Sequence, residues 1–328
     1  MLLSKIRTRI MRHLGMTHTL WNYRKNGVYC FNFHRIGDAN TCQYDPNVFS
    51  CSAEDLEQHL RFIKSNFDII DQASFINIIN SNAPVDKKLA YITFDDGYVD
   101  NYQLAFPILT ALKIPATFFV ATGLIESKTI PWWDEIAWHI KHCHLDELRL
   151  QSWQKTISLS KSTEQLNIRE VLSQFKSASA TIEEQLLELR KATGLLLEHY
   201  DNEFMTWQHL IEMESAGMTI GAHSHSHRIF SSLNANELSH ELSYAKKLLE
   251  EQLSSQVLSI SYPVGDASTY NFEMFDEIER QGYQLAFTFR YYINQEIQQN
   301  KFQLARLSIS EPFDKIKFME LCLNAPVL

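Results

Sequence analysis

The sequence predicts an α/β fold in which parallel strands and helices alternate to form a barrel. Short runs of apolar, β-branched and aromatic residues recur along the chain. Segments with helical periodicity follow most of these runs, and crossovers of that kind suit parallel pairing. Two clusters of acidic residues and histidines stand directly after such runs, at the strand ends where the reactive groups of parallel barrels gather.

The first elements have clear boundaries. Residues 27–33 (GVYCFNF) predict a buried strand that ends at His34. A helix is expected over 52–67, where apolar residues recur at helical spacing and where Glu54 and Asp55 occupy the first turn, as the helix dipole favours. The next elements are expected at residues 89–94 (strand), 101–112 (helix) and 116–121 (strand).

The alternation is interrupted over about residues 126–202, which we interpret as a helical insertion because no strong strand pattern occurs there. It resumes with strands expected at 218–222, 257–262, 285–289 and 302–309, and helices expected at 206–216, 235–253 and 272–281. Seven or eight strand-helix units in one sheet predict a parallel barrel. The expected domains are an N-terminal helical extension (1–27), the barrel with its insertion (28–310) and a C-terminal helical tail (311–328).

Composition is compatible with a large folded domain. The chain has 328 residues, of which 45% are hydrophobic, so burying a full core is not a difficulty. The formal net charge of -9 argues against a general nucleic-acid binder, because no long basic face is present to neutralise phosphates. The five cysteines are irregularly spaced without a Cys-x-x-Cys pair, so neither a disulfide framework nor a thiolate zinc site is expected.

The N-terminus is locally basic. Lys5, Arg7, Arg9 and Arg12 interleave with apolar residues at helix-like spacing. This segment fits either a peripheral contact with an anionic membrane face or a short helix packed on the domain, and its shortness favours the packed helix. No apolar run has the length of a signal peptide or a membrane span. We therefore expect a cytoplasmic protein, with peripheral attachment at the inner membrane face as the alternative.

The first candidate site is the string Thr-Phe-Asp-Asp-Gly at residues 93–97, directly after an expected strand. Asp95 and Asp96 must leave the backbone in different directions, so that one can bind a metal while the other holds a neighbouring water. Gly97 allows the sharp turn that follows. Taken alone, the string is as compatible with a polar turn or a helix cap.

The second candidate site is His-Ser-His-Ser-His at residues 223–227, after another expected strand. If this segment opens a helix, His223 and His227 stand one turn apart and both can reach one ion, while His225 points elsewhere. We expect Ser224 to support the turn, because no histidine-acid pair activates it. Isolated histidines usually have surface or core roles, but the string favours a metal site. Together the two strings predict a metal-dependent hydrolase.

These residues resemble the polysaccharide deacetylases, carbohydrate esterase family 4, with a NodB-like fold. The motif Thr-Phe-Asp-Asp-Gly is matched in full at 93–97, and His-(Ser/Thr)-x-x-His is matched by His223, Ser224 and His227. Further similarity to the family is seen at 32–36 (NFHRI), 114–119 (IPATFF) and 261–265 (SYPVG). The resemblance covers about residues 28–310, interrupted by the insertion.

The resemblance implies a deformed (β/α) barrel of about seven parallel strands that removes an N-acetyl or, less often, an O-acetyl group from an amino sugar. It makes Asp95 the general base and Asp96, His223 and His227 the ligands of a divalent metal, for which we expect Zn²⁺. Such an ion keeps open positions, lowers the pKa of its bound water to about 7 and polarises the acetyl carbonyl. The backbone N–H of Val264, beyond Tyr262 and Pro263, is implied as the oxyanion donor.

The chain departs from the family pattern at two positions. In the family's third motif, which residues 261–265 resemble, an arginine commonly orients the base, but Ser261 stands there. We expect Arg306, near the end of the last strand, to replace it; a surface ion pair is the alternative. The family's proton-donating histidine near the C-terminus is also missing, since His240 is the last histidine. His34 is our substitute, and a water or Asp95 itself is the alternative. Loss of a general acid lowers a rate by about 10² to 10⁴.

Aromatic residues open the insertion. Trp132 and Trp133 are expected to stack on sugar rings in the substrate cleft and Asp134 to bind sugar hydroxyls. Alternatively, the tryptophans anchor the insertion to the barrel rim.

Three functions follow from these residues. The leading one is an amino-sugar deacetylase whose substrate is a nucleotide-linked or lipid-linked saccharide precursor of a surface polysaccharide. The second is a catalytically weak or inactive carbohydrate-binding relative of the family, suggested by Ser261 and the missing late histidine. The third is a non-haem iron oxygenase, since two histidines and a carboxylate also form its facial triad. It is disfavoured because the acid precedes both histidines by more than 120 residues.

Overall fold

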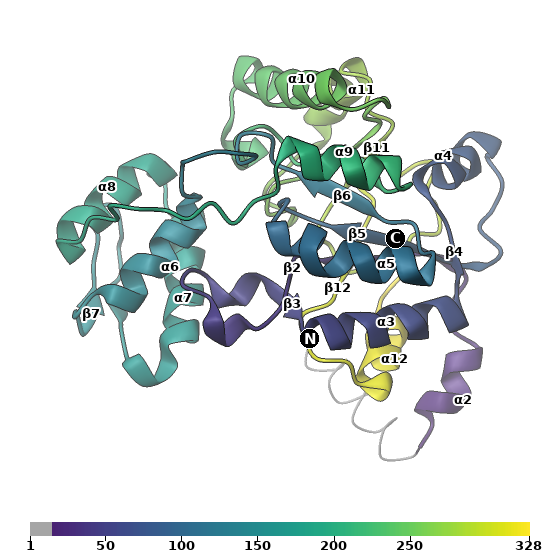
Figure 1. The fold of residues 1–328 in the computed structure, drawn as a ribbon, viewed down its shortest axis with the longest axis horizontal. Helices are drawn as coiled ribbons and strands as arrows, with labels where there is room; N and C mark the ends of the chain where they lie inside the picture. The colour runs from purple at the N-terminus through teal and green to yellow at the C-terminus, as the bar shows by residue number, and fades with distance from the viewer. Residues whose placement is uncertain (1–14) are drawn as a thin grey trace. The chain divides into compact units, whose positions relative to one another are not determined.

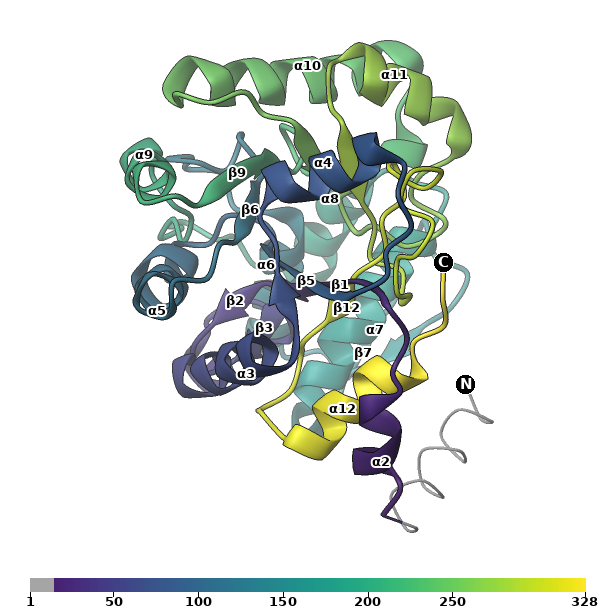
Figure 2. The same ribbon diagram turned by 90° about the vertical axis from the view of Figure 1, so that its right-hand side faces the viewer.

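A computed structural model describes residues 15–328, and the basic N-terminal segment with its expected membrane contact lies outside them. The described chain divides into two compact units (Figures 1 and 2). The first holds Ser50–Glu126 and Glu203–Leu328 together with the chain up to Gly37, and the second holds Asp38–Phe49 and Ser127–Asn202. Within residues 15–328, no helix combines the length and the apolar character that crossing a bilayer demands.

The first unit is built on one sheet of eight strands, all of whose ladders are parallel. In sheet order these are β11 (Leu285–Phe287), β10 (Ser259–Ser261), β9 (Thr219–Ala222), β6 (Thr117–Val120), β5 (Lys88–Phe94), β1 (Gly27–Phe33) and β12 (Leu307–Ser308), with β4 (Asp68–Ile69) paired to the start of β5. Leu304 forms a parallel bridge with Phe287 of β11, whereas Leu307 pairs with Phe31 of β1. The last segment therefore connects the two edges of the curved sheet.

Strand alternation separates two cores in this unit. On β5, the alternate residues Ala90, Ile92 and Phe94 belong to the outer core against the helices, while Leu89 and Tyr91 belong to a second core together with residues from β1, β6 and β11. The alternate positions of β5 that begin with Leu89 and Tyr91 continue with Thr93 and then with Asp95, just beyond the end of the strand. The apolar series thus turns polar at the carboxyl end of the strand, and this is where the candidate site lies.

Eight α-helices of the described chain surround the sheet of the first unit (Figure 2). They are α2 (Thr17–Asn22), α3 (Ala53–Asn66), α4 (Gln72–Ser81), α5 (Phe106–Leu112), α9 (Trp207–Ser215), α10 (Ala235–Gln252), α11 (Phe275–Arg280) and α12 (Lys315–Asn324). The N-cap of α3 is Ser52, whose hydroxyl accepts a hydrogen bond from the Asp55 N–H at 3.1 Å. The helix expected over 101–112 begins as a π-helix at Asn101–Ala105 and becomes α-helical just before Pro107.

One helix and several short strands were not expected from the sequence. They are α4, β4 and the pair formed by β2 (Arg35–Ile36) and β3 (Phe49–Cys51). The strand expected over 302–309 is reduced to β12, because Leu304 pairs with β11 before the chain crosses to β1. Strands of two or three residues contain too few positions to show a period of two, which explains why the sequence pattern misses them.

The second unit contains three α-helices: α6 (Trp132–His142), α7 (Glu164–Ser177) and α8 (Ile182–Thr193). Its core includes the edge-to-face pair Trp153 and Phe175, and the Trp153 indole N–H donates to Gln185 Oε1 at 2.8 Å. A two-stranded antiparallel sheet, β7 (Glu147–Leu148) with β8 (Ile157–Ser158), adds to the expected helices. Residues 38–49 also belong to this unit, which the sequence did not indicate.

Candidate active site

Three potential metal ligands meet at the carboxyl ends of β5 and β9. Asp96 follows β5 by two residues, and His223 and His227 follow β9. Each imidazole places its Nε2 3.4 Å from Asp96 Oδ1, and the two rings lie 4.8 Å apart between centroids. Within residues 15–328, these three form the one cluster of metal-ligating side chains whose ligand atoms all lie within 4.8 Å of one another. All three side chains are buried.

The two histidines are not brought together by a helix, so the expected helical spacing is wrong. Residues 223–229 form a loop. Ser224 and His227 adopt left-handed backbone conformations, with φ of 62° and 56°. The Ser224 hydroxyl accepts a hydrogen bond from the His227 N–H at 2.9 Å, which is the turn-supporting role expected of it. His225 points elsewhere, as expected, with Nδ1 2.9 Å from Thr122 Oγ1.

The donor set fits a divalent ion. The backbone carbonyl of Ser261 can only accept, so His223 Nδ1, 2.8 Å away, carries the ring's proton. The lone pair of neutral His223 Nε2 then faces the Asp96 carboxylate, an arrangement that calls for a cation between them. Two ligand atoms that share a tetrahedral ion at about 2.0 to 2.1 Å lie roughly 3.3 to 3.4 Å apart, which the separations of 3.4 Å match.

Electrostatics in this pocket also favour a positive charge. Burial opposes ionisation of Asp96, but the neighbouring imidazoles of His223 and His227 outweigh it and hold the pKa of the carboxyl well below its usual range. Burial likewise disfavours the charged ring of His223, yet the carboxylates of Asp96 and Asp95 raise its pKa. The pocket is therefore built around a carboxylate that attracts either protons or a metal cation.

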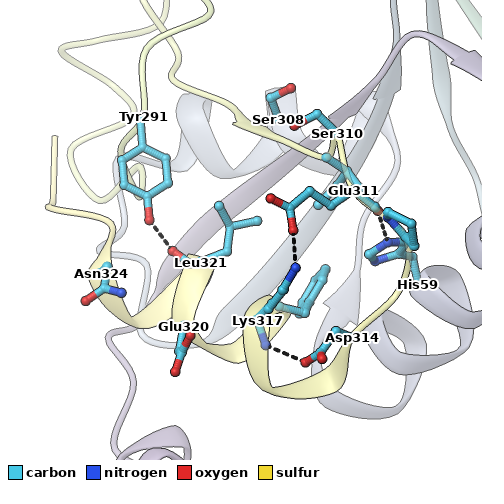
Figure 3. A pocket seen from close by; sticks show the side chains of 13 residues that line it. His59, Tyr291, Ser308, Ser310, Glu311, Asp314, Lys317, Glu320, Leu321 and Asn324 are labelled. Atoms are coloured by element: carbon cyan, nitrogen blue, oxygen red, sulfur yellow. Dashed lines mark hydrogen bonds and ion pairs between the residues drawn. The ribbon is translucent and has the colours of Figure 1, made fainter. Parts of the chain in front are cut away.

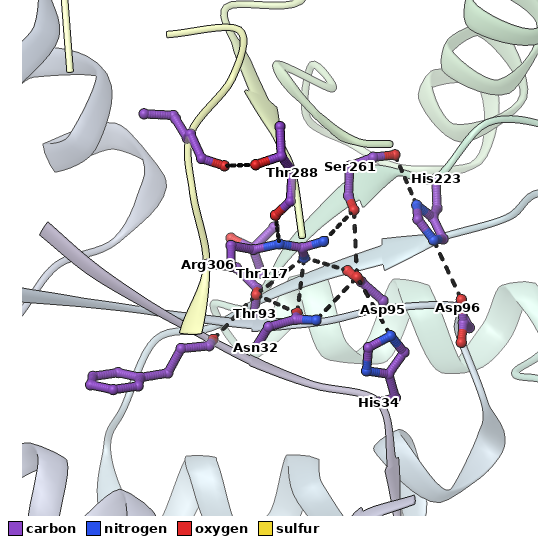
Figure 4. Close-up of polar contacts among 12 residues, drawn as sticks. Asn32, His34, Thr93, Asp95, Asp96, Thr117, His223, Ser261, Thr288 and Arg306 are labelled. Atoms are coloured by element: carbon purple, nitrogen blue, oxygen red, sulfur yellow. Dashed lines mark hydrogen bonds and ion pairs between the residues drawn. The ribbon is translucent and has the colours of Figure 1, made fainter. Parts of the chain in front are cut away.

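Asp95 points away from Asp96 and His223 into a buried hydrogen-bond network (Figure 4). The guanidinium of Arg306 donates from Nη1 to Asp95 Oδ1 at 2.7 Å, from Nη2 to Ser261 Oγ at 2.8 Å and from Nε to the Thr288 carbonyl at 2.9 Å. Arg306 is 2% exposed, so this is a buried pair and not the alternative surface ion pair. Burial alone would raise the pKa of Asp95, but Arg306, together with His223 and His34, outweighs it and lowers that pKa.

Sequence reasoning missed one member of this network. The side chain of Asn32 donates from Nδ2 to Asp95 Oδ2 at 3.2 Å, and its Oδ1 accepts from Arg306 Nη1 at 2.9 Å and from the Thr93 hydroxyl at 2.7 Å. Asn32 is fully buried in the otherwise apolar strand β1. A lone amide inside such a strand is a signal that the sequence does carry, because a buried amide requires hydrogen-bond partners.

The structure places Ser261 between Arg306 and Asp95. Its hydroxyl accepts from Arg306 and lies 3.5 Å from Asp95 Oδ2. The guanidinium therefore reaches Asp95 from the side of β12, while Ser261 occupies the position at which the sequence resemblance implied an arginine.

His34 stands at the mouth of β1, close to Asp95. Its Nε2 lies 3.9 Å from Asp95 Oδ2, and its side chain is 22% exposed while that of Asp95 is 2% exposed. The ring of Phe289 meets the His34 ring edge-on, with centroids 5.6 Å apart. The imidazole thus connects the buried carboxylate with the surface.

The segment 261–265 ends in a strained turn. The Gly265 N–H donates to the Pro263 carbonyl at 2.7 Å, and Val264 between them has a φ of 64°. A β-branched residue in this conformation is rare and costs of order 1 to 3 kcal/mol, which is typical of functional sites. Tyr262 is buried, and its hydroxyl donates to the Phe302 carbonyl at 2.8 Å. Asp96, after β5, also has a left-handed backbone conformation, with a φ of 75°.

The remaining predicted residues open α6 in the second unit. Trp133 and Asp134 are buried there, and Asp134 accepts a hydrogen bond from the Asp45 N–H at 3.3 Å. Trp132 is half-buried, and the Lys176 ammonium lies 5.8 Å from its ring centroid. Burial leaves Trp133 and Asp134 little surface to offer a sugar, so of the three Trp132 is the better placed for stacking.

A separate cavity of about 490 Å³ contains none of the predicted site residues (Figure 3). It is lined by residues of α3, β12 and α12. Polar groups in its lining pair with one another: Lys317 forms an ion pair with Glu311 at 2.7 Å, and the Tyr291 hydroxyl donates to the Leu321 carbonyl. We therefore keep the candidate site at the Asp–His cluster.

The fold and this cluster define a class: a parallel barrel with acidic and imidazole side chains at the carboxyl ends of its strands. A family model described as polysaccharide deacetylase matches residues 82–286, more than half of the chain. The chain belongs to the polysaccharide deacetylase family.

Two relatives indicate how far the sequence similarity reaches. YxkH of Bacillus subtilis, a polysaccharide deacetylase by its name, is 22% identical over 257 residues, which is 78% of this chain. The poly-β-1,6-N-acetyl-D-glucosamine N-deacetylase of Staphylococcus aureus is 30% identical over 115 residues, or 31% of this chain. The chain covers 62% of YxkH and 38% of the staphylococcal enzyme, less than two thirds of either relative.

Solved structures confirm the predicted fold class. The deacetylase PplD of Streptococcus pyogenes, in complex with acetate, matches with a TM-score of 0.58 at 17% identity, over 90% of this chain and 98% of that protein. IcaB of Ammonifex degensii matches with a TM-score of 0.59 at 16% identity, over 92% of this chain and 99% of that protein. At this level of identity the likeness establishes the deformed parallel barrel and nothing further.

Proposed function

We propose that this protein is a metal-dependent deacetylase that removes an N-acetyl or O-acetyl group from an amino sugar. The observation that carries the proposal is the meeting of Asp96, His223 and His227 beside Asp95, a buried carboxylate paired with Arg306. Family membership supports a hydrolase that acts on carbohydrate amides, and a partial relative is named as a poly-β-1,6-N-acetyl-D-glucosamine N-deacetylase.

Asp96, His223 and His227 would hold the divalent ion, for which two imidazoles and one carboxylate make Zn²⁺ the expected metal. When bound, such an ion activates a water and polarises the acetyl carbonyl. Asp95 is then the general base that takes the proton of the attacking water. Arg306 and Asn32 hold its carboxylate in one orientation, and the charge of Arg306 keeps it ionised and able to accept.

Two further groups complete the proposed chemistry. The Val264 N–H, in the strained turn after Pro263, is the proposed donor to the oxyanion of the tetrahedral intermediate. His34 is the proposed general acid, because its ring lies between Asp95 and the surface and can pass a proton to the leaving amine. Tyr262 and Pro263 support this turn from buried positions.

The substrate proposal is an acetylated amino-sugar saccharide, either a surface polysaccharide or its nucleotide-linked or lipid-linked precursor. Trp132, Trp133 and Asp134 stay predicted substrate-binding residues, with Trp132 the first to test. The cytoplasmic location and the peripheral membrane contact also stay predictions, and fractionation of cells that produce the full chain would test them.

Acetate release tests the proposal. We would incubate the purified protein with N-acetylglucosamine oligomers of β-1,4 and β-1,6 linkage, before and after removal of metal with a chelator. We expect release that falls to background on chelation and returns when Zn²⁺ is added back. Release that persists in the metal-free protein contradicts metal dependence.

The same preparations separate the alternatives. Stoichiometric Zn²⁺ binding with no acetate release from any acetylated saccharide would favour the carbohydrate-binding relative. Oxygen consumption by the Fe²⁺-loaded protein would favour the oxygenase.

A further inference from the structure

Glu241, on α10, holds the loop that carries His227. It is 4% exposed. Its Oε2 accepts hydrogen bonds from two successive backbone groups, the N–H of His225 and the N–H of Ser226, both at 2.8 Å. Its Oε1 accepts from the Ser226 hydroxyl. Two successive N–H groups around one oxygen form a concave anion site, and here a carboxylate of the chain itself fills it.

The loop needs such an anchor because its backbone is strained. Ser224 and His227 are non-glycine residues with φ of 62° and 56°. Each left-handed residue of this kind costs of order 1 to 3 kcal/mol and persists only where its surroundings enforce the conformation. Hydrogen bonds to a carboxylate are roughly twice as strong as those to a neutral acceptor. The bonds to Glu241 fall between the two strained residues, where they oppose relaxation of both.

The other edge of the loop is held by the segment that follows β6. The Gly123 N–H donates to the His225 carbonyl at 2.7 Å, and a Cβ added at Gly123 would approach that oxygen to 2.8 Å. The loop is therefore clamped between Gly123 on one side and Glu241 on the other. Loss of the contacts with either Gly123 or Glu241 would leave one side of the loop without hydrogen-bond support.

The two metal-binding histidines depend on this clamp to different degrees. The backbone N–H of His223 donates to the Val120 carbonyl at 2.9 Å, and its ring donates to the Ser261 carbonyl at 2.8 Å. These bonds hold His223 at the end of β9 without the loop. His227 lies beyond the clamped residues, and its N–H donates to Ser224 Oγ of the loop itself. Loss of the anchor should therefore displace His227 more than His223.

We infer that Glu241 is a positioning residue that keeps His227 in place for the metal. This inference rests on the proposed metal site. Glu241 makes no contact with the ion in this role; it acts through the backbone of residues 225 and 226. Residues that hold a metal ligand in place without contacting the ion typically contribute 10-fold to 100-fold in metal affinity.

Metal affinity measures the effect without relying on activity. The dissociation constant of Zn²⁺ alone would be determined by competition with a chromophoric chelator for the wild type, Glu241→Ala and Glu241→Gln. We expect about 10-fold to 100-fold weaker binding in Glu241→Ala. Glu241→Gln should lose about threefold to tenfold, because its amide oxygen still accepts from both N–H groups but without charge. The matched control is Glu251→Gln, an exposed residue of the same helix that pairs with Lys247.

A double-mutant cycle with His227→Ala distinguishes positioning from a general loss of stability. If Glu241 acts through His227, adding Glu241→Gln to His227→Ala leaves the Zn²⁺ affinity unchanged. Equal losses in the presence and absence of His227 would overturn the inference, as would wild-type affinity in both Glu241 variants. If Glu241→Ala does not fold, Glu241→Gln supports the same cycle.

Failure of the proposed function gives a different result. A wild-type protein that binds no stoichiometric Zn²⁺ would refute the metal site and the inference together. A wild type that binds Zn²⁺ and loses it on His227→Ala, while both Glu241 variants retain it, would refute only the role of Glu241.

Discussion

Each of the two units buries a carboxylate against an arginine, and the two pairs differ in what surrounds them. In the first unit, Asp95 and Arg306 are both about 2% exposed and lie next to the Asp–His cluster. In the second unit, Glu135 pairs with Arg190, whose side chain is 42% exposed. Burying a charge is costly unless it is paired, so a fully buried pair calls for a reason beyond stability.

The two carboxylates differ in which groups their oxygens accept hydrogen bonds from. Glu135 accepts two hydrogen bonds from Arg190, at 2.6 and 2.8 Å, and lies 3.7 Å from His139 of its own helix. Asp95 accepts from Arg306 with one oxygen, while its second oxygen accepts from Asn32 and lies 3.9 Å from His34. The first arrangement joins two helices, and the second keeps a carboxylate ionised at the place where a reaction is proposed. The following predictions test this contrast.

The largest effect is expected for Asp95→Asn. The variant keeps the shape and the hydrogen bond from Arg306 but cannot accept a proton, so acetate release should fall by about 10² to 10⁴. Zn²⁺ affinity, measured by chelator competition, should stay close to that of the wild type because Asp96, His223 and His227 remain. An active Asp95→Asn variant would remove the general-base role and leave Asp95 as a structural partner of Arg306.

The next effect concerns stability and distinguishes the buried pair from the half-exposed one. Arg306→Met leaves the Asp95 carboxylate buried without its partner, which costs about 3 to 5 kcal/mol of unfolding free energy. Arg190→Met should cost about 1 kcal/mol or less, because solvent screens an exposed guanidinium. Urea titrations of both variants check this. Equal losses would show that the two pairs play the same part in their units.

His34→Gln comes third. The glutamine cannot donate a proton to a leaving amine, and acetate release should fall by about 10². The loss should be smaller for an activated acetyl ester such as p-nitrophenyl acetate, whose leaving group needs no protonation. Comparing kcat for the two substrates measures this difference. A uniform loss on both would assign His34 to orienting Asp95, and the proton donor would then be sought elsewhere.

Part of the candidate site could be predicted from the sequence, and part could not. Asp95, Asp96, His223 and His227 could be named from the sequence because each stands directly after a strand in a recognisable string. Their convergence follows from parallel topology, which brings carboxyl ends together. The loop at 223–227 could not be predicted, since its left-handed residues are not glycines and give no signal.

Contacts over long sequence separations account for the rest. Arg306 donates to Asn32 across 274 positions. Arg306 was expected near Asp95 from the serine at position 261, but its contact with Asn32 was not predicted. Residues 38–49 fold with the second unit although the insertion begins at Ser127, because separation along the chain says nothing of which core a short polar segment joins.

The smallest predicted effect is a pH-dependent change in the unfolding free energy of Glu135→Gln, a variant of the second unit. Burial opposes ionisation of Glu135, but the nearby His139 ring and the hydrogen bonds from Arg190 outweigh it and lower its pKa. A carboxyl whose pKa is lower in the folded state stabilises the protein above its unfolded pKa of about 4.3 and loses this contribution as the pH falls through the folded pKa. Glu135→Gln should therefore cost about 1 kcal/mol at pH 7, since Arg190 is partly solvated, and the gap to the wild type should narrow below about pH 4.

Urea titrations at pH 7, 5, 4 and 3 measure that gap. Glu170→Gln serves as the control, because its pair with Lys155 is half-exposed on both sides and is expected to contribute little at any pH. A gap that stays constant down to pH 3 would mean that Glu135 acts through shape and hydrogen bonding alone. The carboxylates of the two units would then differ in the use of their charge as well as in their surroundings: Asp95 would need it for chemistry, and Glu135 would not need it at all.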